Sequence, residues 1–409
     1  MASRTVIIVG AGMVGAACAF RLQTAGFVVT LVDPGPDDRA ASFGNAGHIA
    51  VEQVEPLASW GTVRNAPSML FGAGGPLDFR LADAAAWMPW AARYIRACRP
   101  RTFARGRGVL HRLMAPAVLA WRHLLDAAGA AEMLIEDGHA VLWSNDKEAR
   151  SGQSKWMRTD TGNCTLEPLS VRDLEAYGRV LLHRPPVAGL RVRGTARLTS
   201  PQAVRTALLS AFQANGGQRL CGEVIGLSAD GEVELADGTR LSSNRVLISA
   251  GVRSTALMRM VGAVVPLIAE RGYSVQFSAP AWPQSLPTAV LDGQSIVLAP
   301  QSEGLRATSY VEFARPDSPP DPRKWDRLVA RLRAAGLDVP DNHQRWMGSR
   351  PTLPDYVPAI GAVPNSSILY AFGHQHLGVT LSAITAERVL ALTDGLGIED
   401  GLNIDRFST

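Results

Sequence analysis

The chain has 409 residues, of which 46% are hydrophobic and 19% charged, so it can build a folded core and is neither disordered nor collagen-like. Lysine and arginine number 41 against 37 acidic residues, but only three are lysines and none follows a glycine, which excludes a P-loop and argues against Schiff-base chemistry. The four cysteines are widely separated, which argues against a zinc ribbon, an iron–sulfur cluster or a disulfide scaffold, and we expect no metal site.

The first residues of the chain and the lengths of its apolar stretches indicate where in the cell the protein is expected. An apolar run at residues 6–9 begins almost at once, with no basic region and long apolar stretch before it, which argues against a cleaved signal peptide. No window of 18 residues is both strongly apolar and free of charge, so we expect no membrane-spanning helix. These observations predict a cytoplasmic protein.

The first 33 residues predict a strand, a glycine turn, a helix and a second strand. Two apolar runs, 5–9 and 28–32, are typical of strands buried on both faces. Between them stands Gly10-Ala11-Gly12-Met13-Val14-Gly15, and Asp33 ends the second run. In a dinucleotide site such glycines make the tight turn, admit a pyrophosphate to the helix N-terminus and let helix and strand pack closely, while the acid bonds the adenosine ribose. The spacing predicts such a site but does not distinguish FAD from NAD.

The next distinctive segment is basic and aromatic. Residues 84–125 contain eight arginines and no acid, so this segment carries +8, which leaves −4 for the rest of a chain whose formal net charge is +4. Because the charge is local, a general nucleic-acid surface is disfavoured. Two interpretations stay open: a helix that contacts a membrane surface or a partner, or an amphipathic helical pair that packs its aromatic side chains inward and solvates its arginines.

A second strongly patterned block begins at Ser200, which is placed to cap a helix with Pro201 at its first position. Short runs at 224–227, 232–235 and 239–241, separated by Asp-Gly turns, predict a meander of hairpins, and a buried strand follows at 246–251. Farther along we expect alternating strands from 266, a helix near 324–335, an apolar strand at 368–372 and a helix at about 381–392.

Five motifs in order along the chain resemble those of the D-amino-acid oxidase/dehydrogenase superfamily of FAD enzymes. They are Ser42-Phe43-Gly44-Asn45-Ala46-Gly47, Glu223-Val224-Ile225-Gly226-Leu227, Leu247-Ile248-Ser249-Ala250-Gly251, Arg350-Pro351-Thr352-Leu353-Pro354-Asp355, and Phe372-Gly373-His374-Gln375-His376-Leu377-Gly378-Val379-Thr380. The first motif looks most like the bacterial D-amino-acid dehydrogenase branch. The resemblance implies an α/β fold with a Rossmann-like FAD-binding domain (1–55, 200–265 and 346–409) and an interleaved antiparallel-sheet substrate-binding domain (56–199 and 266–345).

The resemblance also implies how FAD is held. It implies that the glycine turn, which includes Met13 and Val14, and Asp33 bind FAD. It further implies contacts with the pyrophosphate and flavin from Ser42, Asn45, Ala46 and Gly47, and a contact with the adenine from Val224. Ala250 and Gly251 are implied contacts as well, and Gly378, Val379 and Thr380 are implied to lie at the O2 edge of the flavin ring. The last three are expected to begin a helix, whose free N–H groups and positive dipole end would stabilise the negative charge of a reduced flavin. Gly44 stands where one branch attaches flavin through histidine, so we expect non-covalent FAD.

Three residues are candidates for the substrate site. By resemblance Arg350 grips the substrate carboxylate, a pairing that suits the geometry of a guanidinium. Tyr273 begins a strand where relatives line the pocket, with a core tyrosine as the alternative. His48 lies where the chain is expected to pass the flavin ring. His374 and His376 flank the flavin-edge loop, and we expect no metal at that pair.

The function that this resemblance implies is oxidative deamination of a D-amino acid. A hydride leaves Cα for flavin N5, and the imino acid hydrolyses to a 2-oxo acid or persists if it is cyclic, as with D-hydroxyproline or D-proline. The alternatives are a glycine/sarcosine-type oxidase that uses oxygen and, in another class, a non-catalytic FAD electron-transfer subunit of a complex. If a quinone or an electron-transfer partner reoxidises the flavin, residues 84–125 are the expected contact, on the inner face of the cytoplasmic membrane.

Overall fold

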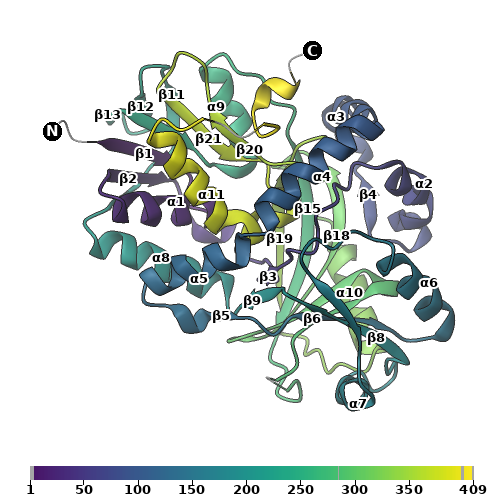
Figure 1. Ribbon diagram of the computed structural model, residues 1–409. Coiled ribbons are helices and arrows are strands. Elements are labelled where there is room, and N and C mark those ends of the chain that lie inside the picture. The colour runs from purple at the N-terminus through teal and green to yellow at the C-terminus, as the bar shows by residue number, and fades with distance from the viewer. Residues whose placement is uncertain (1–3, 284, 398–399, 408–409) are drawn as a thin grey trace.

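The computed structural model describes residues 4–283, 285–397 and 400–407, and two large β-sheets that lie side by side dominate it (Figure 1). One is mainly parallel and has six strands, and the other is mainly antiparallel and has nine. The predicted fold class, a Rossmann-like α/β domain with an interleaved antiparallel-sheet domain, is confirmed.

In the six-stranded sheet every neighbouring pair except the last is parallel, in the order β10 (Gln218–Cys221), β2 (Val28–Asp33), β1 (Thr5–Val9), β14 (Arg245–Ile248), β21 (Ile368–Phe372) and β20 (Ala359–Ala362). Both faces of this sheet are covered. In β1, Val6 and Ile8 belong to one hydrophobic core, and Ile7 and Val9 belong to the other. Two cores explain why the run of apolar residues is continuous rather than alternating.

One face of this sheet carries the helices α1 (Met13–Thr24), α8 (Pro201–Ala214) and α11 (Gly378–Thr393). The other carries α9 (Ser254–Met260) and the hairpin meander of β11 (Val224–Leu227), β12 (Glu232–Leu235) and β13 (Arg240–Ser242). Helix α8 begins at the predicted cap, because Ser200 Oγ accepts the N–H of Ala203 at 3.3 Å.

The nine-stranded sheet runs in the order β19 (Gln344–Thr352), β15 (Ile268–Phe277), β18 (Gly304–Ala314), β17 (Ile296–Gln301), β16 (Thr288–Leu291), β6 (His139–Trp143), β8 (Ala188–Arg193) and β7 (Thr165–Pro168), with β4 (Leu77–Phe79) beside β18. Helix α10 (Pro322–Ala334) packs on it. A small sheet of β3 (His48–Ile49), β9 (Ala196–Leu198) and β5 (Leu134–Ile135) stands apart from the two large ones. Further helices outside the arginine-rich segment are α2 (Trp60–Met69), α6 (Asp146–Trp156) and α7 (Val171–Gly178).

The arginine-rich segment forms three helices, α3 (Ala84–Ala97), α4 (Pro100–Met114) and α5 (Ala117–Ala127), rather than a pair. All eight of its arginines are exposed, whereas Trp90 and Trp121 are buried. Trp90 and Trp121 therefore pack inward, as the second interpretation expects, whereas Trp87, Tyr94 and Phe103 are half-buried. No helix in the described ranges is long and apolar enough to cross a membrane.

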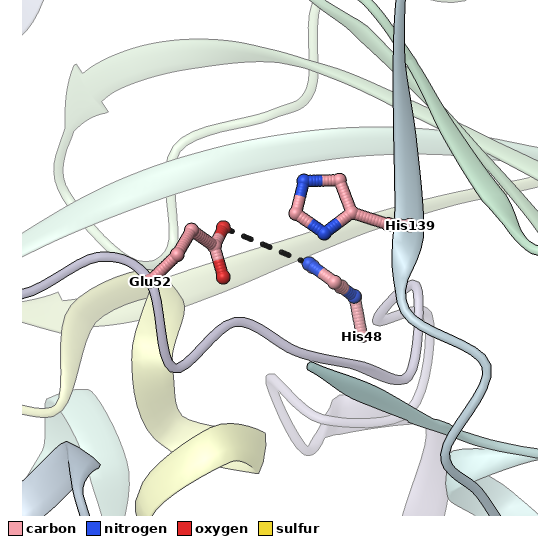
Figure 2. Close-up of side chains that lie close together, drawn as sticks. All are labelled: His48, Glu52 and His139. Atoms are coloured by element: carbon pink, nitrogen blue, oxygen red, sulfur yellow. Dashed lines mark ion pairs between the residues drawn. The ribbon is translucent and has the colours of Figure 1, made fainter. Parts of the chain in front are cut away.

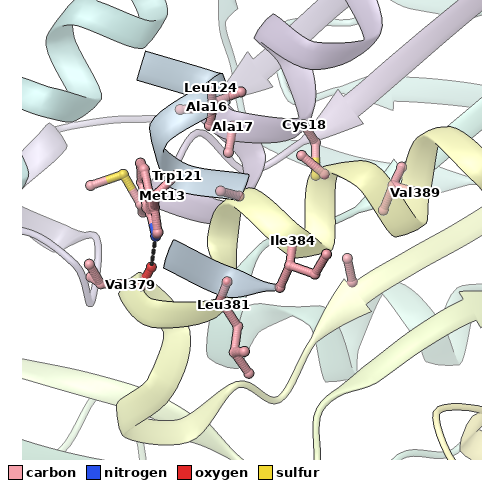
Figure 3. Packing of buried hydrophobic residues seen from close by; sticks show 14 of the residues in the cluster. Met13, Ala16, Ala17, Cys18, Trp121, Leu124, Val379, Leu381, Ile384 and Val389 are labelled. Atoms are coloured by element: carbon pink, nitrogen blue, oxygen red, sulfur yellow. Dashed lines mark hydrogen bonds between the residues drawn. The ribbon is translucent and has the colours of Figure 1, made fainter. Parts of the chain in front are cut away.

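Two boundaries differ from the expected division into domains. Strand β19 belongs to the nine-stranded sheet up to Thr352, although residues from 346 onward were expected in the other domain. Helices α4 and α5 lie within the range expected for the substrate-binding domain, yet Leu113 and Trp121 share a core with α1 and α11 (Figure 3). The chain thus crosses between the two halves more often than its composition indicates.

Candidate functional site

The glycine turn joins β1 to α1. Its first and last glycines, Gly10 and Gly15, have no room for a side chain, whereas the space beside Gly12 is empty of protein atoms. Gly10 has a φ of 104°, and a Cβ there would lie 2.7 Å from the Ala250 Cα. A Cβ on Gly15 would lie 1.8 Å from the Gly10 carbonyl oxygen, whereas one on Gly12 would meet nothing within 4 Å. Gly12 is also the N-cap of α1 and offers no capping side chain. Open space therefore faces the uncapped N-terminus of a helix, which fits a pyrophosphate.

Asp33, at the carboxyl end of β2, braces this turn. Its Oδ2 accepts the N–H of Ala11 at 2.7 Å, and its Oδ1 accepts the N–H of Gly35 at 2.8 Å. Ala250 and Gly251 follow β14 at the same edge of the sheet, and Val224 begins β11 shortly after β10 pairs with Asp33. The structure thus brings the predicted glycine turn, Asp33, Ala250 and Gly251 to one edge, where α/β sheets bind ligands.

The loop 42–47 lies against the glycine turn, because Ser42 Oγ accepts the N–H of Met13 at 3.3 Å. The nine-stranded sheet holds this loop from its other side. Arg306 donates to the carbonyls of Phe43 at 3.0 Å and Asn45 at 2.9 Å, and Gln301 donates to those of Asn45 at 3.2 Å and Ala46 at 3.3 Å. Burial lowers the pKa of Arg306 to about 10, which still leaves it charged at neutral pH. A buried cation therefore stands behind the predicted pyrophosphate loop.

The first turn of α11 approaches this loop. Trp121 of α5 donates to the carbonyls of Val379 at 3.0 Å and Thr380 at 3.2 Å (Figure 3). Thr380 Oγ1 accepts the N–H of Ala50 at 3.0 Å and donates to the His48 carbonyl at 3.4 Å. The helix has no acid in its first turn and no side-chain cap. Its N-terminus is therefore suited to developing negative charge, and the flavin-edge role of Gly378, Val379 and Thr380 stays a prediction.

Arg350 of β19 lies opposite Glu270 of β15 in the register. Arg350 Nη1 donates to Glu270 Oε1 at 3.1 Å, and the other carboxylate oxygen of Glu270 accepts from Thr352 Oγ1 at 3.1 Å and from the Tyr356 hydroxyl at 3.0 Å. The Arg350 side chain is 23% exposed and that of Glu270 only 2%. A Cβ on Gly272 would lie 2.2 Å from Arg350 Nη2, so only glycine leaves room for the guanidinium. The result is a fixed, partly open cation suited to a carboxylate.

The structure does not bring Tyr273 to this cation. Successive side chains of a strand point to opposite faces, and Gly272, like Glu270, lies on the face of Arg350. The Tyr273 hydroxyl donates to Glu312 Oε2 at 2.7 Å and accepts the N–H of Asp321 at 3.0 Å, and the residue is 1% exposed. Burial, together with Glu312, raises the pKa of Tyr273. This placement supports the alternative of a core tyrosine with a satisfied hydroxyl.

His48 belongs to a buried cluster with Glu52 and His139 (Figure 2). His48 Nε2 lies 3.7 Å from Glu52 Oε1, and its ring meets that of His139 edge-on with centroids 4.5 Å apart. Burial opposes ionisation of Glu52, but the neighbouring imidazoles lower its pKa to about 2; burial lowers the pKa of His139 to about 3. At neutral pH the cluster therefore holds an ionised carboxylate and at least one neutral imidazole.

His376 lies beside the 48–52 segment, because its Nε2 donates to Gln53 Oε1 at 2.6 Å. Burial lowers its pKa to about 4. The structure holds Arg350 against Glu270 and His48 against Glu52 and His139. His374 points into the structure toward Thr385 Oγ1 at 3.0 Å.

Several residues that shape the site were not predicted from the sequence. They are Glu270, which fixes Arg350; Arg306 and Gln301, which hold the loop 42–47; and Arg205, which donates to the Ala11 carbonyl at 2.5 Å. One signal was present for Glu270, because an acid in a strand with every residue buried requires a buried cationic or hydrogen-bonding partner. The others come from segments without motifs.

Known proteins resemble the chain over nearly its full length. A family model described as DAO, FAD dependent oxidoreductase, matches residues 5–392. The chain is 30% identical over 407 residues to a D-amino-acid oxidase of Bradyrhizobium diazoefficiens, covering 96% of this chain and 95% of that protein. It is 30% identical over 409 residues to D-amino acid dehydrogenase 2 of Pseudomonas aeruginosa, covering 96% and 94%. The crystal structure of glycine oxidase from Geobacillus kaustophilus has the same fold, with a TM-score of 0.70, 20% identity and 99% of each chain covered.

Proposed function

The chain belongs to the family of FAD-dependent oxidoreductases, and from this membership we propose that it catalyses the oxidative deamination of a D-amino acid. The names of the relatives, a D-amino-acid oxidase and D-amino acid dehydrogenases, favour this substrate class. The structural observation that carries the proposal is Arg350, a partly open cation whose orientation Glu270 fixes from behind. A guanidinium held in this way is suited to bind the carboxylate of an amino acid in one orientation.

In this proposal the glycine turn and α1 hold the pyrophosphate, the loop 42–47 follows it, and the first turn of α11 faces the flavin. FAD, when bound, supplies the acceptor for the hydride that leaves Cα. Binding is non-covalent: a Cβ on Gly44 would lie 2.0 Å from the Trp346 ring, so a histidine at this position would require that ring to move. The open space at Gly12 supports the pyrophosphate position.

The side chains have a modest chemical task. Arg350 binds the carboxylate and so fixes which face of Cα is presented, while the substrate amine reacts in its neutral form. His48 lies beside the first turn of α11 and His376 just before it, and in this proposal both bound the substrate site. The product is an imino acid, which water converts to a 2-oxo acid or which persists when cyclic, as for D-proline or D-hydroxyproline.

Anaerobic reduction tests this proposal. The purified flavoprotein is mixed without oxygen with D- and L-amino acids, sarcosine, glycine and the isomers of hydroxyproline, and loss of flavin absorbance is followed. We expect bleaching by one or more D-amino acids and a large loss of rate in Arg350→Ala. Bleaching by sarcosine and glycine alone would support a glycine/sarcosine-type oxidase, and bleaching by no compound would support an electron-transfer subunit.

A second part of the proposal concerns reoxidation. We infer that a quinone or an electron-transfer partner accepts the electrons, and that α3 and α4 form a peripheral contact with the inner face of the membrane. Arg93, Arg96 and Arg99 are exposed there, and so are Met88 (58%) and Ile95 (41%). Exposed arginines beside exposed apolar side chains are typical of interfacial helices.

Co-sedimentation with vesicles tests this surface. The intact protein should pellet with vesicles that contain anionic phospholipid and less with neutral ones, and the variant with Arg93, Arg96 and Arg99 replaced by Ser should remain in solution. Equal sedimentation of the two proteins would refute the membrane contact. Stoichiometric hydrogen peroxide under air, with no faster turnover when a quinone is added, would instead assign oxygen as the acceptor.

A further inference from the structure

We propose that His48, Glu52 and His139 form a binding site for a divalent transition-metal ion of the zinc type. The three side chains offer two imidazole nitrogens and one carboxylate oxygen, and one such atom of each lies within 4.8 Å of the others (Figure 2). Two imidazoles and a carboxylate are a ligand set that Zn²⁺ and similar ions accept, with further positions left for water or a substrate atom. Because His48 is also proposed to bound the substrate site, the test of this inference uses metal binding and not turnover.

Three polar atoms of the cluster lack hydrogen-bond partners, whereas Glu52 Oε1 accepts from Gln53 Nε2 at 3.4 Å. Both ring nitrogens of His48 and Oε2 of Glu52 are buried and have no hydrogen-bond partner among the described residues. The side chains of His48 and Glu52 are only 10% and 4% exposed. Buried polar atoms without partners are rare and costly, and a buried carboxylate requires a compensating positive charge. A cation bound between the three side chains supplies that positive charge. It also gives His48 and Glu52 a partner for their unpaired polar atoms.

His139 has one hydrogen-bond partner outside the cluster. Its Nδ1 lies 3.1 Å from Thr195 Oγ1, which donates to the Val192 carbonyl at 3.4 Å. Nδ1 is also the ring nitrogen that faces His48 and Glu52 (Figure 2). Coordination of a metal through Nδ1 therefore requires the ring proton to lie on Nε2, and the bond to the ion replaces the hydrogen bond to Thr195.

The distances require a small closure. A central point between three atoms that all lie within 4.8 Å of one another is at most about 2.8 Å from each, whereas zinc ligands lie at about 2.0–2.2 Å. Each ligand atom must therefore move inward by well under an ångström, which rotation of the Glu52 and His48 side chains can supply. Because His139 comes from β6 of the nine-stranded sheet and the other two from the 48–52 segment beside α11, the ion would join the two halves of the fold.

Metal binding to the flavoprotein tests the proposal. The protein is treated with EDTA, dialysed, and titrated with ZnCl₂ by calorimetry, and retained zinc is measured after gel filtration. We expect one zinc per chain and a rise in melting temperature, with affinity reduced about 100-fold or more in His139→Ala and in Glu52→Gln. Flavin absorbance and circular dichroism report whether each variant is folded, and Glu52→Gln, which keeps its size, serves if His139→Ala does not fold.

His111→Ala is the matched control, because His111 is a partly exposed histidine paired with Asp160 at 2.7 Å and lies outside the cluster. This variant should bind zinc as the unmodified protein does. The proposal is overturned if the unmodified protein retains no zinc, or if His139→Ala and Glu52→Gln retain as much zinc with the same affinity. Neither measurement depends on turnover, so failure of the metal site and failure of the proposed reaction are distinguishable.

Discussion

Replacing Gly12 by alanine separates cofactor binding from folding at the glycine turn. Gly12 has a φ of −64°, which alanine adopts without strain, and its added Cβ meets no protein atom within 4 Å. The apoprotein should therefore lose about 1 kcal/mol or less, the usual effect of exchanging glycine for alanine at an N-cap. The methyl group does, however, occupy the space through which a pyrophosphate would approach the helix N-terminus.

The expected loss of cofactor affinity follows from the contacts that the methyl group blocks. Hydrogen bonds from backbone N–H groups to a charged phosphate are worth about 1.5–3 kcal/mol each. Loss of one such bond corresponds to roughly a 10- to 100-fold weaker dissociation constant for FAD. The dissociation constant is measured by titrating apoprotein with FAD and following flavin fluorescence, and stability by urea unfolding of the same apoprotein.

Two further variants make this experiment decisive. Gly72→Ala, at an exposed glycine whose Cβ also meets nothing within 4 Å, should change neither quantity. Gly15→Ala places its Cβ 1.8 Å from the Gly10 carbonyl oxygen and should destabilise the apoprotein itself. Unchanged FAD affinity in Gly12→Ala, or a loss of stability as large as that of Gly15→Ala, would refute the assignment of this space to the pyrophosphate.

Arg350→Lys keeps the charge but loses the planar fork, so kcat/KM for the reducing amino acid should fall about 100-fold in steady-state assays; an unchanged value would remove Arg350 from the substrate site. Glu270→Gln leaves Arg350 charged but loosely held, and it should raise KM more than it lowers kcat, while an equal fall in kcat would point to a different role. Burial lowers the pKa of His374 to about 4, below the value of about 6.5 in the unfolded chain. As the pH falls from 6.5 toward 4, the unfolded chain takes up a proton that the folded protein does not. The free energy of unfolding should therefore fall by about 3 kcal/mol in total over this range. The free energy of unfolding, measured with urea at pH 7 and at pH 5, should change less between the two pH values in His374→Gln than in the unmodified protein. An equal change in both proteins would contradict this reasoning.

The elements with strong local signals were predictable from the sequence. The apolar run of β1, the Ser200 cap of α8 and the Asp-Gly turns of the hairpin meander each specify a structure through contacts a few residues apart. Strand β10 was missed because it is a short, largely exposed edge strand without the apolar pattern of its neighbours. Strand β19 continues in the nine-stranded sheet past the expected boundary at 346, because a motif marks chemistry and not the sheet to which a strand belongs.

The candidate site divides in the same way. Motifs identified the glycine turn and Arg350 as candidates, and the structure brings the turn, Asp33 and Ala250 to one edge, while the roles of these residues stay predictions. The face to which Tyr273 points was not, since a strand with every residue buried gives no alternation from which to read it. His139 and Glu52 meet only because β6 lies beside the 48–52 segment, and a separation of 87 residues leaves no spacing to recognise.

The bonds from Arg306 and Gln301 to the loop 42–47 have a consequence for assembly. The glycine turn lies in the first residues of the chain, but the donors that hold its companion loop lie on β17 and β18, some 250 residues later. During synthesis the first strands emerge long before these donors, so the cofactor loop has no anchor until most of the chain is made. We therefore expect FAD to be acquired late, once the strands that carry Gln301 and Arg306 have folded against the loop.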